Sequence, residues 1–328
     1  MHIDHRFSWG RAVIAVSLLM TLLSARVRAQ TGPDLLAKPW PDKDQYFDGR
    51  GAALFDNAGH VKESDQSFRM DSYESIGRFH LIPGNEISPR VGYDFSFMDL
   101  HTNDKRLPNQ LTDVSVGFGM GLFKKGNWIG AMTLGVGYAS DSAFANGAAW
   151  YGKADAMLIN QLNENDFIGF VIDYDGHRPT WPDIPLPGFG YSHRFDPRLQ
   201  MVIGVPFSSL SWKPTDQLDI ELEYEILTDL RSDVSYEFIK HWKAYGLLDY
   251  RRDAYHVSEL PSDRRLLFVQ HRVEAGIRFQ PKDQITAGLG LGYSFGTKFR
   301  SGWDFQDTHS VASVSDVPYI RAEVLIRF

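Results

Sequence analysis

The chain has 328 residues, of which 43% are hydrophobic and 13% aromatic, and it contains no cysteine. Its formal net charge at pH 7 is −7, so it lacks the basic surface that nucleic-acid binding requires, and we exclude nucleic acid as a partner. Without cysteine there is no disulfide framework, so packing or lipid must supply the stability of the fold.

The first 29 residues are expected to be a cleaved secretory signal. Two arginines begin the segment, residues 12–23 are apolar, and the small residues Val27 and Ala29 occupy positions −3 and −1 of a cut before Gln30. The apolar run is too short for a membrane-spanning helix, which needs about 18 or more residues. The mature chain would carry 30 basic and 40 acidic residues, a net charge of −10.

Residues 30–70 form a polar segment, which we expect to be either a plug or a disordered tail. Residues 71–328 contain no linker rich in Pro, Ser or Gly, which favours one folded unit. The apolar stretch around residues 73–82 leaves room for a further pair of strands, with a partner near residues 52–70.

A period-two alternation of apolar and polar residues dominates the chain from residue 88 onwards. The clearest case is residues 218–226, where every even-numbered residue is apolar or aromatic and every odd-numbered residue is a carboxylate. Because side chains on a strand point alternately to opposite faces, the pattern predicts strands with one apolar and one polar face. The alternation recurs at residues 91–98, 113–122, 128–138, 233–238, 267–279, 284–295 and 320–328.

The connections between these strands alternate in length, as turns and loops of a transmembrane β-barrel do. Short connections are expected at 124–127, 161–166, 194–197, 213–217, 239–242 and 280–284. Long connections are expected at 100–111, 140–148, 175–187, 227–231, 250–265 and 298–316. At Val205-Pro206 the alternation requires a long loop, but the sequence shows only a kink.

The predicted fold is all-β: one antiparallel transmembrane barrel with an even number of strands. Counting back from Phe328 to the strand at 88–99 predicts about 14 strands, within a range of 12–16, and the pair near 52–82 would make 16. The alternative fold is a secreted soluble β-sandwich, whose strands would have about 5–6 residues. Ten-residue strands with aromatics near both ends favour the barrel.

If the apolar faces contact lipid, the alternate residues line the lumen. The predicted acidic wall consists of Asp219, Glu221, Glu223, Glu225, Asp233 and Glu237. The predicted basic lumen residues are Lys243, Arg251, Arg272, Arg278, Arg321 and Arg327. Either these charges pair across strands as polar filler, or they set up a transverse field in a water-filled pore that favours cations.

Glycines on the same inner faces, at 117, 119, 121, 135, 137, 288, 290, 292 and 296, allow two interpretations. They could leave the lumen wide, or mark where a loop or the N-terminal segment packs against the wall. The proline-rich segment 178–187 is stiff enough to fold over a barrel mouth, and an ordinary surface loop is the alternative.

Two short motifs were candidates for chemistry, and neither supports it. Ser192 and His193 are neighbours on a strand, so they point to opposite faces and cannot act as nucleophile and base. Residues 173–176 resemble part of a calcium loop, but the later acidic ligands are missing. We therefore expect no catalytic residue, no cofactor and no metal site.

The last strand resembles the final strand of bacterial outer-membrane β-barrels, because residues 320–328 alternate and end in the aromatic Phe328. The whole mature chain resembles porin-like barrels of that class. Residues 204–214 resemble an uncharacterised bacterial family known only as a domain of unknown function. The resemblance implies a location in the bacterial outer membrane, with Phe328 as the signal read by the barrel-insertion machinery and with outer-membrane lipid as a partner. It leaves the oligomeric state open.

Three functions remain open from the sequence. The first is a passive pore for small polar solutes. The second is an outer-membrane lipid hydrolase of the phospholipase or lipid-A-modifying type. The third is a plugged structural or binding barrel without transport.

Overall fold

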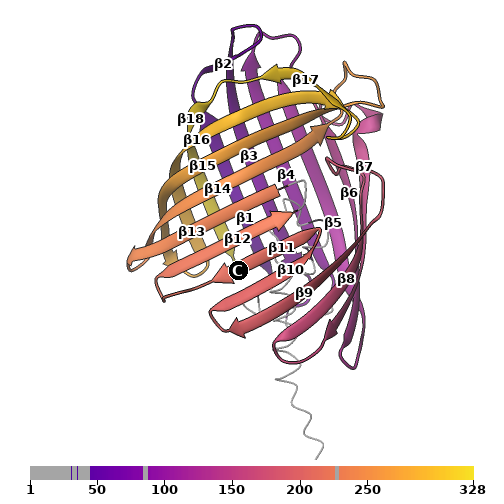
Figure 1. The fold of residues 1–328 in the computed structure, drawn as a ribbon, viewed down its shortest axis with the longest axis vertical. Helices are drawn as coiled ribbons and strands as arrows, with labels where there is room; N and C mark the ends of the chain where they lie inside the picture. The colour runs from indigo at the N-terminus through magenta and orange to yellow at the C-terminus, as the bar shows by residue number, and fades with distance from the viewer. Residues whose placement is uncertain (1–30, 32–34, 36–44, 84–87, 226–228) are drawn as a thin grey trace, which may run out of the picture.

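The computed structural model describes Thr31, Leu35 and residues 45–83, 88–225 and 229–328, and these form a closed β-barrel (Figure 1). The expected signal segment 1–29 lies outside the described residues. The barrel strands are β1 (Phe47–Asp56), β3 (Gln66–His80), β4 (Arg90–Thr102), β5 (Gln110–Lys125), β6 (Trp128–Ser140), β7 (Trp150–Gln161), β8 (Asp166–Asp175), β9 (Leu186–Asp196), β10 (Leu199–Val205), β11 (Phe207–Trp212), β12 (Leu218–Glu225), β13 (Asp229–Ile239), β14 (Trp242–Tyr255), β15 (Arg265–Lys282), β16 (Ile285–Gly302) and β18 (Val317–Arg327). Two further strands, β2 (Gly59–Val61) and β17 (Thr308–Ser313), and a 3₁₀ turn at Gly147–Ala149 lie outside these sixteen.

Strand pairing closes the barrel without a free edge. The first strand, β1, pairs antiparallel with β3 on one side and with β18 on the other, and each further pair of neighbours among the described strands is also antiparallel. At the seam, the carbonyl of Phe328 accepts hydrogen bonds from the amides of Tyr46 (2.7 Å) and Phe47 (2.6 Å). The predicted all-β, antiparallel, even-stranded barrel is confirmed.

The predicted number of about 14 strands is wrong, because the barrel has sixteen. The missing pair is β1 and β3, and β1 lies within residues 30–70, which the sequence assigned to a plug or tail. The outward face of β1 carries glycine at 49 and 51 and alanine at 53, and its inward face carries both Arg50 and Leu54. Small outward residues and a mixed inner face hide the alternation that marks the other strands.

Short turns and long loops lie at opposite ends of the barrel. At the turn end lie the start of β1, the end of β18 and tight connections such as Gly126-Asn127 and Lys240-His241. The loop end carries most of the longer connections, but there Pro206 alone joins β10 to β11 and residues 226–228 join β12 to β13. The longer connection between β3 and β4, residues 81–89, lies at the turn end. The strands next to Pro206 are short: β10, β11 and β12 have 7, 6 and 8 residues, whereas β15 and β16 have 18 each.

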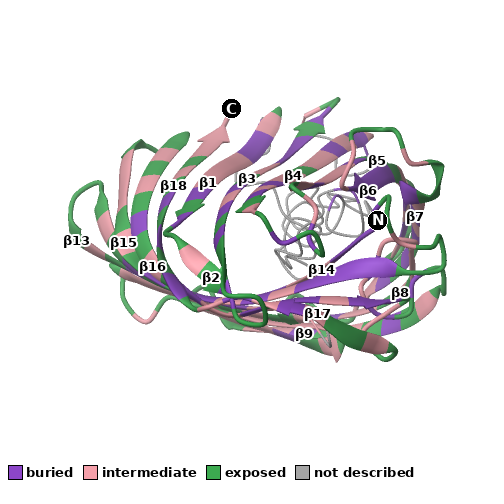
Figure 2. Cartoon of the chain, turned by 90° about the horizontal axis from the view of Figure 1, so that it is seen from above, coloured by how far each residue is buried: buried purple, intermediate pink, exposed green. Residues whose placement is uncertain are grey.

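Apolar side chains cover the outside of the barrel, and buried and exposed residues alternate along its strands (Figure 2). Exposed outward residues come from all sides of the wall, including Phe95, Val116, Leu134, Ile172, Phe189, Leu222, Val273, Leu291 and Ile320. A soluble protein rarely exposes such a continuous apolar surface, which suits contact with lipid. No helix in the described part of the chain is long and apolar enough to cross a membrane.

At the loop end the barrel narrows, because the ends of β6 and β14 meet. Ser140 and His256 form a bridge: the Ser140 hydroxyl donates to the His256 carbonyl (2.6 Å), and the His256 amide donates to the Ala139 carbonyl (3.1 Å). On the other side β2 pairs with residues 313–315, next to β17. The described strands β2–β6 and β14–β17 therefore form a smaller ring, which bypasses β7–β13.

Apolar side chains fill this ring, and we call them the loop-end core. They are Val61, Phe68, Met70, Met98, Leu100, Leu107, Leu111, Ala139, Tyr255, Val257, Leu266, Phe268, Phe299, Ala312 and Val314. Phe299 lies at its centre, with ring centroids 5.3 Å from Phe268 and 6.0 Å from Phe68. All fifteen are buried, so within this ring the loop end of the barrel has a packed interior.

Candidate functional site: the polar lumen

The inner face of the barrel is the candidate site. The structure places all twelve predicted charged residues on the inward register of β12, β13, β14, β15 and β18, opposite the exposed apolar residues. For example, Leu222 and Tyr224 are exposed on the outside of β12, whereas the preceding residues Glu221 and Glu223 are half-buried.

The acidic wall and the basic residues are not separate surfaces. Asp219 forms ion pairs with Lys243 (3.1 Å) and Lys213 (3.2 Å). Asp233 accepts two hydrogen bonds from the guanidinium of Arg278, at 2.9 and 2.7 Å. Glu237 lies opposite Lys243 in the strand register. The carboxylates of β12 and β13 thus lie next to cations from other parts of the wall, namely Lys213, Lys243 and Arg278.

The other predicted basic residues also have carboxylate partners. Arg321 binds Glu274 (3.2 Å) and Glu323 (3.0 Å), and Arg278 reaches Glu323 as well (2.7 Å). Arg272 binds Asp249, and Arg327 lies 3.5 Å from Asp48. Each of the six predicted cations therefore has an acidic group within 4 Å.

The partner carboxylates Asp249, Glu274 and Glu323 are not among the predicted site residues. All three share the inward register with cations that were recognised, so the same alternation could have identified them. Asp48 and Glu74 are not among the predicted site residues either, because they belong to β1 and β3, the pair of strands that the prediction of about 14 strands leaves out.

Two cations, Arg251 and Arg272, reach across the lumen to Glu74 of β3, at 2.6 and 3.9 Å. Arg251 of β14 donates to Glu74 of β3 (2.6 Å) and to the hydroxyl of Ser96 on β4 (3.2 Å). Its guanidinium also lies 5.4 Å from the centre of the Phe268 ring, in the loop-end core. Arg251 therefore marks the boundary between the polar lumen and the apolar core.

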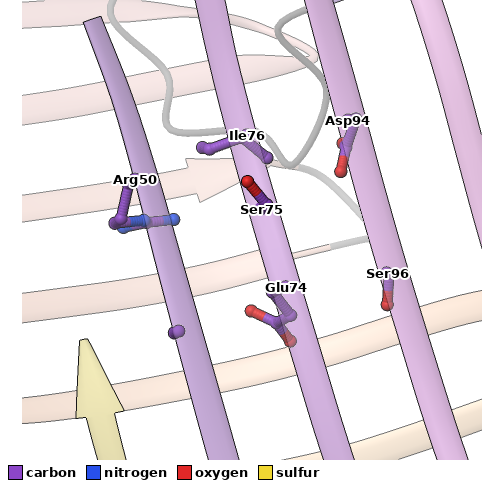
Figure 3. A pocket seen from close by; sticks show the side chains of 7 residues that line it. Arg50, Glu74, Ser75, Ile76, Asp94 and Ser96 are labelled. Carbon is purple, nitrogen blue, oxygen red and sulfur yellow. The ribbon is translucent and has the colours of Figure 1, made fainter. Parts of the chain in front are cut away.

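Below this boundary the described part of the inner wall lines a small and a larger cavity. A small one of about 30 Å³ lies beside Glu74, where Arg50, Asp94 and Ser96 from β1 and β4 also contribute (Figure 3). It has room for a water molecule. The larger one, here called the turn-end cavity, has a volume of about 360 Å³. Its lining is Arg50, Lys213, Asp219, Glu221, Asp233, Ser235, Lys243, Arg278, Gln280, Thr286, Glu323, Leu325 and Arg327.

Several inner-face glycines make room for large side chains of the neighbouring strand. A Cβ atom at Gly292 would lie 2.2 Å from the ring of Tyr319, and one at Gly137 would lie 2.2 Å from that of Tyr151. Gly117 instead faces the N-terminal segment, because a Cβ there would lie 2.6 Å from the backbone oxygen of Thr31. At these positions glycine serves packing against the wall and does not widen the lumen.

Thr31 and Leu35 lie inside the barrel and are fully buried. The hydroxyls of Thr31 and Ser115 are 2.9 Å apart, and the Leu35 carbonyl accepts a hydrogen bond from Arg90 (3.4 Å). Within the segment 30–70, Thr31 and Leu35 therefore contact the inside of the wall. The strand β1, the short strand β2 and the start of β3 follow, and β1 and β3 are part of the wall itself.

The proline-rich loop at 176–185 folds over the loop end. Arg265, at the start of β15, donates hydrogen bonds to the carbonyls of His177 (3.2 Å) and Arg178 (3.1 Å). The ring of His177 stacks on that of Tyr151, with centroids 4.6 Å apart. Burial lowers the pKa of His177, and burial together with the charge of Arg265 lowers the pKa of His256 to about 4. Both imidazoles are therefore neutral at pH 7.

The two chemical motifs weighed in the sequence have other partners. The Ser192 hydroxyl donates to the Met201 carbonyl (3.3 Å), and His193 Nδ1 lies 2.7 Å from Asp166. Asp173 and Asp175 form ion pairs with Arg178 (2.5 Å) and Lys153 (3.3 Å).

No family model matches the sequence, and no curated protein matches it. Among solved structures, the chain is similar to a deltaS2S3 mutant of the monoaromatic hydrocarbon channel TodX, with 9% identity, a TM-score of 0.46, and coverage of 94% of this chain and 93% of that one. It is also similar to the toluene transporter TodX of Pseudomonas putida, with 8% identity, a TM-score of 0.38, and coverage of 94% and 92%. The KdgM porin is 7% identical, with a TM-score of 0.26 and coverage of 85% of this chain and 99% of that one. The barrel fold of this chain rests on its own strand pairing.

Proposed function

We propose that this protein is a bacterial outer-membrane channel for small polar solutes. The observation that carries the proposal is the contrast between the two faces of a closed barrel: apolar side chains all round the outside, and ion pairs and a 360 Å³ polar cavity inside. The first strand β1 begins at the turn end and the last strand β18 ends there, and we assign this end to the periplasm. The direct test is conductance in a planar lipid bilayer. A purified, folded barrel that never conducts, with or without its N-terminal segment, would contradict the proposal.

The charge preference of this channel depends on the balance of acids and bases along the lumen. The turn-end cavity is lined by cations and carboxylates in similar numbers, so we expect at most a modest preference for cations. Three neighbouring acids, Glu221, Glu223 and Glu225, lie on one strand and can be neutralised together.

Replacing Glu221, Glu223 and Glu225 with glutamine should move the preference towards anions, because the substitution removes three fixed negative charges from the lumen wall. The measurement is the reversal potential in a salt gradient across the bilayer. The matched control neutralises three exposed loop residues, Glu63, Glu164 and Glu259. An unchanged reversal potential in the lumen variant would remove the acidic wall from the mechanism of selection.

Contacts of Thr31 and Leu35 with the inner wall favour a second property, an N-terminal segment that obstructs the lumen. Deleting residues 30–44 should then raise the single-channel conductance about twofold or more, since conductance grows with the open cross-section of a pore. This deletion spares β1, whereas deleting residues 30–70 would remove a strand of the wall. Equal conductance of the intact and shortened proteins would show that the segment does not obstruct the path.

A further inference from the structure

The loop end has two parts that differ in chemistry. The ring closed by the β6–β14 contact is filled by the loop-end core, whose fifteen residues are all buried and apolar. Opening a path through it would expose this core to water, at a high cost in free energy. The ring is therefore the firmly closed part of the loop end.

At the loop end, the part bordered by β7–β13 carries polar inward groups, and apolar clusters occupy its inner face only nearer the turn end. Lys153 and Asp175 pair across β7 and β8 (3.3 Å), and Tyr151 donates a hydrogen bond to Asp113 (2.6 Å). Lower on the same side, Thr133 donates to Asp155. A polar solute that moves along these groups exchanges one set of hydrogen bonds for another, so this side offers the easier route.

The loop 176–185 covers this polar side and is held at the far wall by few contacts. The guanidinium of Arg265 joins the His177 and Arg178 carbonyls to the Trp303 carbonyl, to which it donates at 2.8 and 2.7 Å. The amide of Phe305 also donates to the Pro179 carbonyl (3.3 Å). These contacts are polar, and one aromatic contact joins them, between His177 and Tyr255 of β14 with ring centroids 6.1 Å apart. Such contacts open at lower cost than a packed apolar core.

Two residues of the loop have an unfavourable backbone conformation, which the surrounding contacts must hold in place. Trp181 and Asp183 have φ values of 53° and 60°, in the left-handed region that non-glycine residues adopt only at a cost. Inside the loop, Arg178 donates to the Ile184 carbonyl (3.2 Å) and pairs with Asp173. The loop can therefore move as one ordered unit when its outer contacts break.

We propose that the loop 176–185 is the extracellular gate of the channel, that Arg265 holds it closed, and that solutes leave on the β7–β13 side. The inference rests on the proposed channel function. It assigns the route past the loop-end core and gives Arg265 a positioning role, since it acts on the loop through backbone carbonyls.

Two disulfides distinguish this route from a path through the ring, and the absence of native cysteine makes them unambiguous. Pro179→Cys with Phe305→Cys joins the loop to the far wall at a backbone contact of 3.3 Å. Ser140→Cys with His256→Cys fixes the β6–β14 bridge. Oxidation should lower conductance about tenfold in the first pair and leave it unchanged in the second, and dithiothreitol should restore it in the same bilayer.

Reversal by dithiothreitol shows that the barrel is folded and conducts, so a failure here is distinct from a failure of the channel proposal. If oxidation of the 140–256 pair blocks conductance and oxidation of the 179–305 pair does not, solutes pass through the ring and the inference is wrong. Conductance that neither disulfide changes would equally contradict the gate.

A second variant tests Arg265 without a disulfide. Arg265→Met keeps a long side chain but removes all donors, and it should raise the open probability about fivefold or more. The matched control is Arg264→Met, which removes a neighbouring exposed cation that lies 3.4 Å from His309. Equal open probabilities of the two variants would remove Arg265 from the gate.

Discussion

Replacing Arg278 with alanine should destabilise the folded barrel by about 3 kcal/mol. Arg278 joins Asp233 of β13 to Glu323 of β18 across the inner wall, and its guanidinium lies 3.9 Å from the centre of the Tyr245 ring. Without it, two carboxylates that are 7% and 9% exposed lose their shared cation. The turn-end cavity admits water to them, which places the effect at the lower end of the range for breaking a buried pair.

The measurement is urea unfolding of the barrel in lipid vesicles, followed by tryptophan fluorescence. Arg198→Ala is the matched control, because Arg198 and Asp216 form an ion pair of 2.6 Å whose side chains are 54% and 88% exposed. Removing an exposed pair should change stability by less than about 1 kcal/mol. Equal effects of the two substitutions would show that the charges of the inner wall contribute no more than surface pairs do.

Replacing Phe299 with alanine should cost about 3–5 kcal/mol, the largest effect that we expect for a single residue. Its ring is fully buried in the loop-end core and contacts the rings of Phe68 and Phe268, so truncation leaves a cavity enclosed by the closed ring of strands. The same unfolding assay measures the change.

The control for this substitution is Phe189→Ala on the outside of β9, where the side chain is 61% exposed. A residue that faces lipid loses contacts with acyl chains but leaves no enclosed cavity, so its loss should cost about 1 kcal/mol or less. If Phe299→Ala were as mild as Phe189→Ala, the loop-end core would not be tightly packed.

Local patterns were sufficient for most of the wall. In β12 the alternation of Leu218 to Glu225 assigns each residue to its face, because a strand places successive side chains on opposite sides whatever its neighbours are. The alternation of turn and loop lengths likewise predicted which connections share an end of the barrel. Where the outward residues are small, as at Gly49, Gly51 and Ala53 of β1, the pattern disappears and the strand was missed.

The sequence by itself determined a β-barrel with an apolar outside and a charged inside, because period-two alternation is a property of each strand alone. Only the tertiary structure decided which charges meet, since partners such as Arg251 and Glu74 are 177 residues apart and come together through the tilt and closure of the wall. The contact of Ser140 with His256, and with it the division of the loop end into an apolar ring and a polar side, follows from the same closure. No local pattern encodes a contact between strands that meet only after the barrel has closed.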